Sequence, residues 1–305
     1  MRSIVVGVRG GPGPDPALDL ALEEAVRRRL PLEVVHTFDA VELEDWPPVL
    51  SPHRLQARCT AEARVVAEAL AAAVKRVPGA ETVATHTLVT EGAPSACLLS
   101  LGSRTALLVV GRRGGAGLRR GVRRSVSSSV LHNSWAPVLL VPPEAPRVVD
   151  RWTHSRVVVG LDGSRASLSA LVWGVEQARE WGSVLAPVVV SSLTGRVPVA
   201  LAERNADLTI ATWAVVREAG GQSVEVHPHF LEGSPSRSLL SFARPEDLLV
   251  VGSRGRGGPS SLVLGSTSTL VAEQASCPVV VIRDGQTRRE LHQRRSQEPR
   301  IALPR

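Results

Sequence analysis

The sequence predicts an α/β protein built from two tandem, doubly wound domains. Three observations support this: the length of 305 residues, an internal repeat, and short Val/Ile/Leu-rich runs that alternate with helical stretches. At about 150 residues per domain, the length suits two domains, each large enough to bury a core. Hydrophobic residues make up 43% of the chain and charged residues 21%, which is typical of a globular protein and excludes a disordered one.

The internal repeat divides the chain into two copies. Ile4–Gly11 (IVVGVRGG) aligns with Val157–Ser164 (VVVGLDGS) at an offset of 153 residues. Leu108–Gly114 (LVVGRRG) aligns with Leu249–Gly255 (LVVGSRG) at an offset of 141. The change in offset means that the first copy carries about twelve extra residues, near Asp39–His53.

The repeat sets the expected domain boundaries. We expect a first domain at 1–145, a linker at 146–153 that begins among prolines, and a second domain at 154–284. The remaining segment, 285–305, is polar and Arg-rich, and we expect a basic, flexible tail.

Each copy alternates predicted strands with predicted helices. Short apolar runs are typical of strands buried on both faces; they are Ile4–Val8, Leu32–His36, Val83–Val89, Leu107–Val110, Val138–Val141, Val157–Leu161, Val184–Val190, Val224–Leu231, Leu248–Val251 and Val279–Ile282. Stretches with helical period include Pro16–Arg29, Leu55–Val77, Ser167–Trp181 and Ser266–Gln274. This alternation favours mainly parallel sheets flanked by helices, with ligands outside the carboxyl ends of the strands.

The net charge of +7 is concentrated in two segments. Six arginines and no acids lie within Gly111–Arg124, and six more arginines lie in the tail. A face for duplex DNA needs a continuous basic patch, and aromatic residues are only 3% of the chain. Nucleic acid is therefore not the expected partner, although the Arg-rich loop and tail keep this alternative open.

No segment is apolar for long enough to cross a membrane, because the longest apolar runs have four to six residues. The start of the chain lacks the apolar stretch and cleavage site of a signal peptide. The three cysteines are too few and too scattered for a disulfide framework. We expect a cytoplasmic protein.

Two signals in the second copy mark the carboxyl ends of predicted strands. Asp162 directly follows Val157–Leu161, and a longer pattern begins where Leu248–Val251 ends. This pattern is Gly252, two residues, Gly255, nine residues, and then Gly265-Ser266-Thr267 at a predicted helix start. A Walker A loop is excluded, since the only lysine is elsewhere, and so is a G-x-G-x-x-G fingerprint.

The residue types in this pattern suit a phosphate-bearing ligand. Glycines allow positive φ and close approach of the backbone, and a helix start offers N–H groups and a positive dipole end. The hydroxyls of Ser266 and Thr267 can donate to phosphate oxygens or support a metal ion. A carboxylate at Asp162 suits a ribose hydroxyl or a base N–H, because it would repel phosphates.

On these residues, both copies resemble universal stress protein domains, and the chain resembles a tandem member of that family. The family's G-x-x-G, nine residues, G-[ST] motif is matched in the second copy without a mismatch. The resemblance implies five-stranded sheets of order 3-2-1-4-5 and ATP with Mg2+ or Mn2+. It also implies dimerisation through the last strand. The implied nucleotide-binding residues are Gly160, Asp162, Val190, Gly252, Gly255, Gly265, Ser266 and Thr267.

The first copy departs from this motif. Arg9 stands at the position of Asp162, and Arg124 at the position of Gly265. An arginine there would collide with a phosphate, and positive φ would be unfavourable for it. With the aspartate contact also lost, we expect ATP to bind the first copy about a hundredfold more weakly than the second, or not at all.

These observations favour an ATP-binding regulator of the stress response over a dedicated enzyme, since no nucleophile paired with a general base is apparent. A slow ATPase or phosphotransferase using Ser266 or a nearby serine is one alternative, and ATP turnover well above about one per minute would favour it. The last strands, Val138–Val141 and Val279–Ile282, would otherwise leave exposed apolar edges, so we expect them to pair within the chain. Whether two chains also form a homodimer stays open.

Overall fold

The computed structural model describes residues 2–11, 13–39, 52–102, 104–112, 125–145, 156–191, 198–220, 223–255 and 264–284, with only the backbone of 52 and 198–205. The predicted linker and tail, the Arg-rich segment 113–124 and most of the predicted insert lie outside these residues.

The first domain alternates strands and helices in the predicted order. Its elements are β1 (Ser3–Gly7), α1 (Pro16–Arg28), β2 (Leu32–Phe38), α2 (Pro52–Arg76), the short 3-10 helix η1 (Ala80–Thr82), β3 (Thr85–Glu91), α3 (Pro94–Ser100), β4 (Thr105–Gly111), α4 (Val126–Asn133) and β5 (Val138–Val141). Helix α1 begins where Asp15 accepts a hydrogen bond from the Ala17 backbone N–H (2.9 Å) and Pro16 occupies the first helical position.

The second domain repeats this order. Its elements are β6 (Arg156–Leu161), α5 (Arg165–Trp181), β7 (Val184–Ser191), α6 (Pro198–Glu218), β8 (His229–Glu232), α7 (Pro235–Phe242), β9 (Leu248–Gly252), α8 (Ser266–Gln274) and β10 (Val279–Ile282). Helix α8 has the predicted bounds, and Gly182 in the left-handed region (φ 66°) ends α5.

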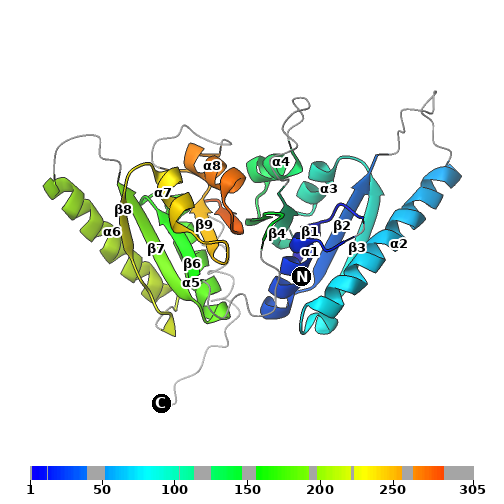
Figure 1. Ribbon diagram of the computed structural model, residues 1–305, viewed down its shortest axis with the longest axis horizontal. Helices are drawn as coiled ribbons and strands as arrows, with labels where there is room; N and C mark the ends of the chain where they lie inside the picture. The colour runs from blue at the N-terminus through cyan, green and yellow to red at the C-terminus, as the bar shows by residue number, and fades with distance from the viewer. Residues whose placement is uncertain are drawn as a thin grey trace, which may run out of the picture.

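The strands form one ten-stranded sheet in the order β3-β2-β1-β4-β5-β10-β9-β6-β7-β8. Each half has the predicted order 3-2-1-4-5, and all pairs within a half are parallel. β5 and β10 pair antiparallel, with Leu139 opposite Val280, which is the intramolecular pairing expected from their apolar edges. Figure 1 shows the two halves side by side around this central pair, with α2 and α6 at the outer flanks.

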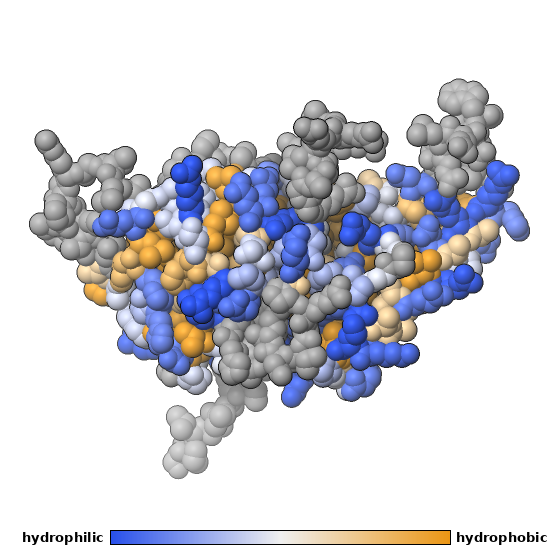
Figure 2. Space-filling model, in the orientation of Figure 1, coloured by the Kyte–Doolittle hydropathy of each residue, from blue (hydrophilic) through white to orange (hydrophobic). Residues whose placement is uncertain are grey.

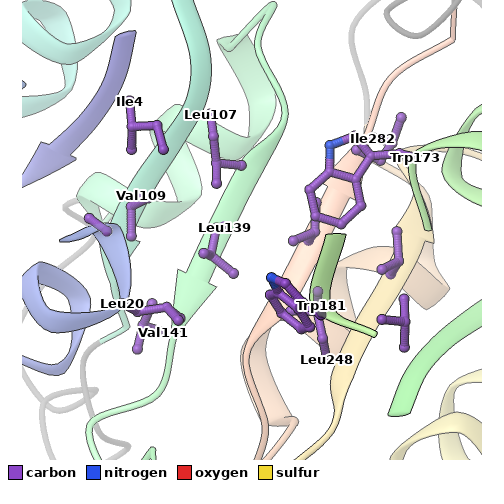
Figure 3. Close-up of a cluster of buried hydrophobic side chains, with 14 of the residues drawn as sticks. Ile4, Leu20, Leu107, Val109, Leu139, Val141, Trp173, Trp181, Leu248 and Ile282 are labelled. Atoms are coloured by element: carbon purple, nitrogen blue, oxygen red, sulfur yellow. The ribbon is translucent and has the colours of Figure 1, made fainter. Parts of the chain in front are cut away.

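Both faces of the sheet carry a hydrophobic core that continues across the domain boundary. Helices α1, α2, α5 and α6 cover one face and α3, α4, α7 and α8 the other. Figure 3 shows part of the first core, in which side chains of both domains lie close together: Ile4, Leu20, Leu107, Val109, Leu139, Val141, Trp173, Trp181, Leu248 and Ile282. The shared core makes the two domains one packed unit.

A buried polar network joins α1 to α5. Glu24 and Gln177 occupy equivalent positions of the repeat, and the Gln177 side-chain amide donates to the Glu24 carboxylate (3.1 Å). Arg28 donates to both side chains, its Nε lying 2.7 Å from Glu24 Oε2, and its guanidinium stacks over the Trp173 ring at 5.3 Å. Because one member of the equivalent pair is neutral, two carboxylates do not face each other.

The predicted strand Val224–Leu231 is wrong in extent. Regular pairing is limited to β8, with one isolated bridge between Leu185 and Val226. Pro187 in β7 and Pro228 before β8 each lack the N–H that a continuous ladder needs. This end of the sheet is therefore only loosely paired.

The outer surfaces of the two domains differ in polarity. In Figure 2, blue polar side chains line the outer side of α2, whereas orange apolar ones are visible on the side of α6, β7 and β8. Exposed apolar side chains on this second side include Ile210, Trp213 and Phe230. Across the described residues, no helix combines the length and apolar character needed to span a membrane.

Candidate functional site

All eight residues singled out from the sequence line one cavity of about 520 Å3 in the second domain. The cavity lies at the carboxyl ends of β6 and β9, between which the strand order of this domain reverses. Doubly wound sheets bind ligands at such a reversal. The lining residues from the sequence analysis are Gly160, Asp162, Val190, Gly252, Gly255, Gly265, Ser266 and Thr267.

Asp162 follows β6 in the turn that leads to α5. Its Oδ1 accepts a hydrogen bond from the Ser164 backbone N–H (2.9 Å). Its Oδ2 lies against Gly255, where a Cβ would come within 2.6 Å of that oxygen. The Ser164 hydroxyl donates to the Arg254 carbonyl (3.1 Å). Ser164 thus anchors the loop after β9 to the start of α5, and Asp162 orders the turn before α5, which are structural roles that the sequence analysis did not foresee.

Helix α8 presents its amino end to the cavity. Gly265 is the N-cap residue, so no side chain caps the first-turn N–H groups. Among the described residues, the hydroxyls of Ser266 and Thr267 have no hydrogen-bond partner. The Ser268 hydroxyl donates to the Gly252 carbonyl (2.6 Å) and holds the helix against β9. Uncapped N–H groups and the positive end of the helix dipole make this end suitable for an anion.

None of the three motif glycines has positive φ, and they differ in what an added Cβ would meet. The positive-φ part of the expectation is therefore wrong, whereas the close approach of a ligand to these glycines stays a prediction. At Gly252 a Cβ would lie 2.6 Å from the Ala166 carbonyl carbon, so packing of α5 demands glycine there. At Gly265, with φ −68°, a Cβ would meet its nearest atoms at 3.5 Å, an ordinary contact. The protein itself does not require glycine at 265.

Arg254 is a lining residue that the sequence analysis missed. Of the described residues around the cavity, it alone carries a positive charge. Burial, and then the charge of Arg254, lower the pKa of Arg283, so two cations lie near this end of the sheet. Its position between the two glycines of Gly252-Ser-Arg-Gly255 could have identified it from the sequence.

The remaining walls of the cavity are mainly apolar. They include Leu161, Pro235, Leu239, Val251 and Leu264 besides Ser167 and Ser268, so the site combines an apolar compartment with a polar, positively charged end. Within the described part of the chain, no group of three or more His, Cys, Asp or Glu side chains is arranged to hold a metal ion.

The first domain has a cavity of about 350 Å3 in the equivalent place. Arg9 lines it in place of Asp162, and Arg112 in place of Ser253. Helix α4 is capped by its own Ser125, whose hydroxyl accepts from the Ser128 N–H (3.1 Å). Arg124 lies outside the described residues. This crevice therefore offers a different chemistry on the same framework.

Contacts between α4, α8 and the central strands connect the two crevices. Arg112 Nη1 donates to the Ala272 carbonyl of α8 (3.4 Å). Arg283, which follows β10, donates to the carbonyls of Leu131 (3.2 Å) and His132 at the end of α4. Ala272 and Leu131 are equivalent positions of the repeat, so each helix accepts an arginine from the opposite domain. In Figure 1, α4 and α8 face each other across the middle of the molecule.

Comparison with known proteins agrees with the repeat and the fold. The model of the universal stress protein family matches residues 1–142 and 153–283. Universal stress protein Rv2005c of Mycobacterium tuberculosis is 30% identical over 293 residues, covering 92% of this chain and 97% of its own. A universal stress protein structure from Archaeoglobus fulgidus aligns with a TM-score of 0.65 and 22% identity, covering 93% of this chain and 97% of its own. A universal stress protein solved in complex with cAMP covers 42% of this chain at a TM-score of 0.33.

Proposed function

Because the chain belongs to the universal stress protein family, we propose that it is a regulatory protein that binds ATP in the crevice of its second domain. One observation carries the proposal: the predicted residues line a single cavity, and the uncapped amino end of α8 forms part of its wall. The cavity volume of about 520 Å3 is within the range of small-molecule sites. The cytoplasm, where unpaired cysteines stay reduced, is part of the proposal.

The division of the cavity into two compartments suits the two parts of the ligand. The base lies among apolar walls next to Val190, and Asp162 accepts from a ribose hydroxyl or a base N–H. The phosphates lie at the start of α8, where first-turn N–H groups, the Ser266 and Thr267 hydroxyls and Arg254 donate to their oxygens. Glycine at 265 leaves room for this approach, since the protein itself does not fill that space.

A divalent cation fits this arrangement only together with the phosphates. The described residues hold no carboxylate cluster, and Mg2+ commonly retains several waters and binds substrate phosphates. Its protein ligands would be the hydroxyls of Ser266 and Thr267. When bound, the ion neutralises phosphate charge and orients the oxygens.

Regulation follows from the position of α8 between ligand and domain boundary. Phosphates would contact the first turn of α8, and the Ala272 carbonyl near its other end accepts from Arg112 of the first domain. The Ser253 N–H also donates to Ile282 of β10 (2.7 Å), next to the central strand pair. A ligand that contacts these elements can favour one arrangement of the two domains over another.

The test is nucleotide content and affinity of the full chain. We expect mass spectrometry to find an adenine nucleotide bound to the purified wild type. The variant Gly265→Arg, which copies Arg124 of the first domain, should lose it. Titration calorimetry with ATP and Mg2+ should give one site per chain. Gly111→Ala, a glycine substitution in the first-domain crevice, is the control and should leave ATP binding unchanged. Two equivalent sites, or no affinity at millimolar ATP, would contradict the proposal.

Two further measurements separate the alternatives drawn from the sequence. Incubation with labelled ATP and Mg2+ should show turnover below about one per minute for a regulator, and a faster rate would indicate an ATPase or phosphotransferase. Salt-sensitive retention on DNA or RNA that is lost when 285–305 is deleted and Arg119, Arg120, Arg123 and Arg124 are neutralised would indicate a nucleic-acid-associated protein.

A further inference from the structure

The crevice of the first domain keeps a cavity although it has lost the nucleotide motif. Its volume of about 350 Å3 lies at the lower end of the range for small-molecule sites. Much of the lining is apolar and comes from the carboxyl ends of the strands and from the helices beside them. The apolar residues include Val8, Val35, Leu98, Val110, Val126 and Val141. A cavity of this kind suits a compact ligand with an apolar body.

Two arginines lie at the polar end of this cavity. Arg9 is exposed at its edge, and Arg112 is partly buried. Among the residues that the structure describes, neither guanidinium lies within ion-pair distance of a carboxylate. Arg112 has five N–H donors and uses one of them, in a long hydrogen bond of 3.4 Å to the Ala272 carbonyl. Both side chains therefore retain donors for an anion.

Burial lowers the pKa of Arg112, and the charge of Glu144 only partly offsets this effect. A cation that is desolvated without a close counter-charge gains from an anionic ligand more than a solvated cation does. Thr37 and Ser127 also line the cavity, and the Ser127 hydroxyl is hydrogen-bonded to that of Ser125 (3.0 Å).

The same crevice disfavours a nucleotide. Ser125 caps α4 with its own hydroxyl and occupies the place at which the second domain leaves α8 open. Asp15 lines the cavity, and its carboxylate would repel a ligand of high negative charge. The aspartate that would receive the ribose or base is replaced by Arg9.

We propose that the first-domain crevice binds a small organic carboxylate with an apolar body. A carboxylate carries a single charge and a planar pair of acceptors that guanidinium groups match well. Its apolar body would lie against Val35, Leu98 and Val110, with the carboxylate toward Arg9 and Arg112. The site is separate from the ATP site proposed for the second domain.

The test uses the full chain and two defined probes, benzoate and 4-methylpentanoate, each compared with its uncharged amide. Titration calorimetry should detect both carboxylates, and we expect their amides to bind at least about tenfold more weakly. Arg112→Ala should weaken the carboxylates by about tenfold or more, and Arg9→Ala by about threefold because that side chain is exposed.

Arg283→Ala is the matched control for Arg112→Ala. It also removes an arginine contact between the domains, to Leu131, but Arg283 does not line this cavity. We expect it to leave carboxylate affinity unchanged. Equal losses in both variants would overturn the proposal, because the effect would then come from the domain boundary. Absence of binding by both probes at millimolar concentration would overturn it as well.

The two sites can fail independently. Saturating ATP should not displace benzoate from the chain, and Gly265→Arg should abolish ATP binding while benzoate still binds. Competition between ATP and benzoate for one site would overturn the proposal for the first domain. Benzoate binding without any ATP binding would instead contradict only the function proposed for the second domain.

Discussion

The two crevices are built on the same strands, and they differ mainly in where the surrounding helices begin. In the second domain α5 starts at Arg165 and is capped by Ser164. In the first domain α1 starts at Pro16, about one turn later in the repeat, after a loop rich in glycine and proline. The extra turn of α5 packs its backbone directly on Gly252, whereas among the described residues an added Cβ at the equivalent Gly111 would have only Ala17 nearby.

The helices at the other side of the two crevices, α4 and α8, differ in how their first turns are capped. Helix α4 is capped by the Ser125 side chain, and α8 starts at Gly265 without a side-chain cap. The second domain thus leaves polar backbone groups open to a ligand where the first satisfies its own. Differences of a few residues at helix starts can change the chemistry of a site while the strands and cores stay alike.

The largest expected effect concerns the packing of α5 on β9. We expect Gly252→Ala to lower the free energy of unfolding by about 2–3 kcal/mol, because the added Cβ would lie within 2.9 Å of three backbone atoms of Ala166 and Ser167. Gly111→Ala should change it by less than about 0.5 kcal/mol, since of the residues that the structure describes its Cβ would meet only the Ala17 Cβ, at 3.8 Å. Urea denaturation without nucleotide measures both. Similar losses in the two variants would show that the glycines are equivalent.

The next largest effect concerns Gly265, where an added Cβ should affect ATP binding but not the stability of the fold. Gly265→Ala should weaken ATP by about tenfold, because its Cβ would occupy the approach to the first turn of α8. The free energy of unfolding should stay within about 0.5 kcal/mol, since the nearest atoms are 3.5 Å away. Calorimetry and urea denaturation of the same samples give the two numbers. An unchanged ATP affinity would mean that phosphates do not approach this glycine.

The sequence was sufficient for the architecture because the repeat, the buried runs and the strand–helix alternation all depend on local residue patterns. It was also sufficient to select residues that prove to share one cavity. The sequence could not show why glycine is needed at 252, because the contact of Gly252 with Ala166 joins two segments more than 80 residues apart in the chain. Arg254 was overlooked because the motif drew attention to the glycines on either side of it.

The third prediction compares the two helix caps. Ser125→Ala should lower the free energy of unfolding by about 1 kcal/mol, because the Ser128 N–H would lose its side-chain acceptor. The equivalent Ser266→Ala removes no cap and should change it by only a few tenths of a kcal/mol, at most. Denaturation of both variants in urea is the measurement. A loss for Ser266→Ala as large as that for Ser125→Ala would contradict the difference between α4 and α8.

The smallest expected effect is a pH dependence confined to the first domain. Burial raises the pKa of Asp15 above its ordinary value, although hydrogen bonds from Ala17 and Leu18 and the charge of Arg9 oppose the rise. Around this pKa the folded state holds more protons on Asp15 than the unfolded state does, so this carboxyl lowers stability as the pH rises. The N-cap residue of α5 in the second domain, Ser164, has no carboxyl group and so no such dependence.

Asp15→Asn should therefore be more stable than wild type at neutral pH by less than about 1 kcal/mol, because asparagine also caps helices well. The difference should shrink as the pH falls and be smallest below about 4, where Asp15 is protonated in both states. Urea denaturation at several pH values measures it, with Ser164→Asn as the control whose effect should not vary with pH. A stability advantage of Asp15→Asn that grows on acidification would mean that the first-domain loop stabilises the charged carboxylate. Burial of Asp15 would then not distinguish the start of α1 electrostatically from the start of α5.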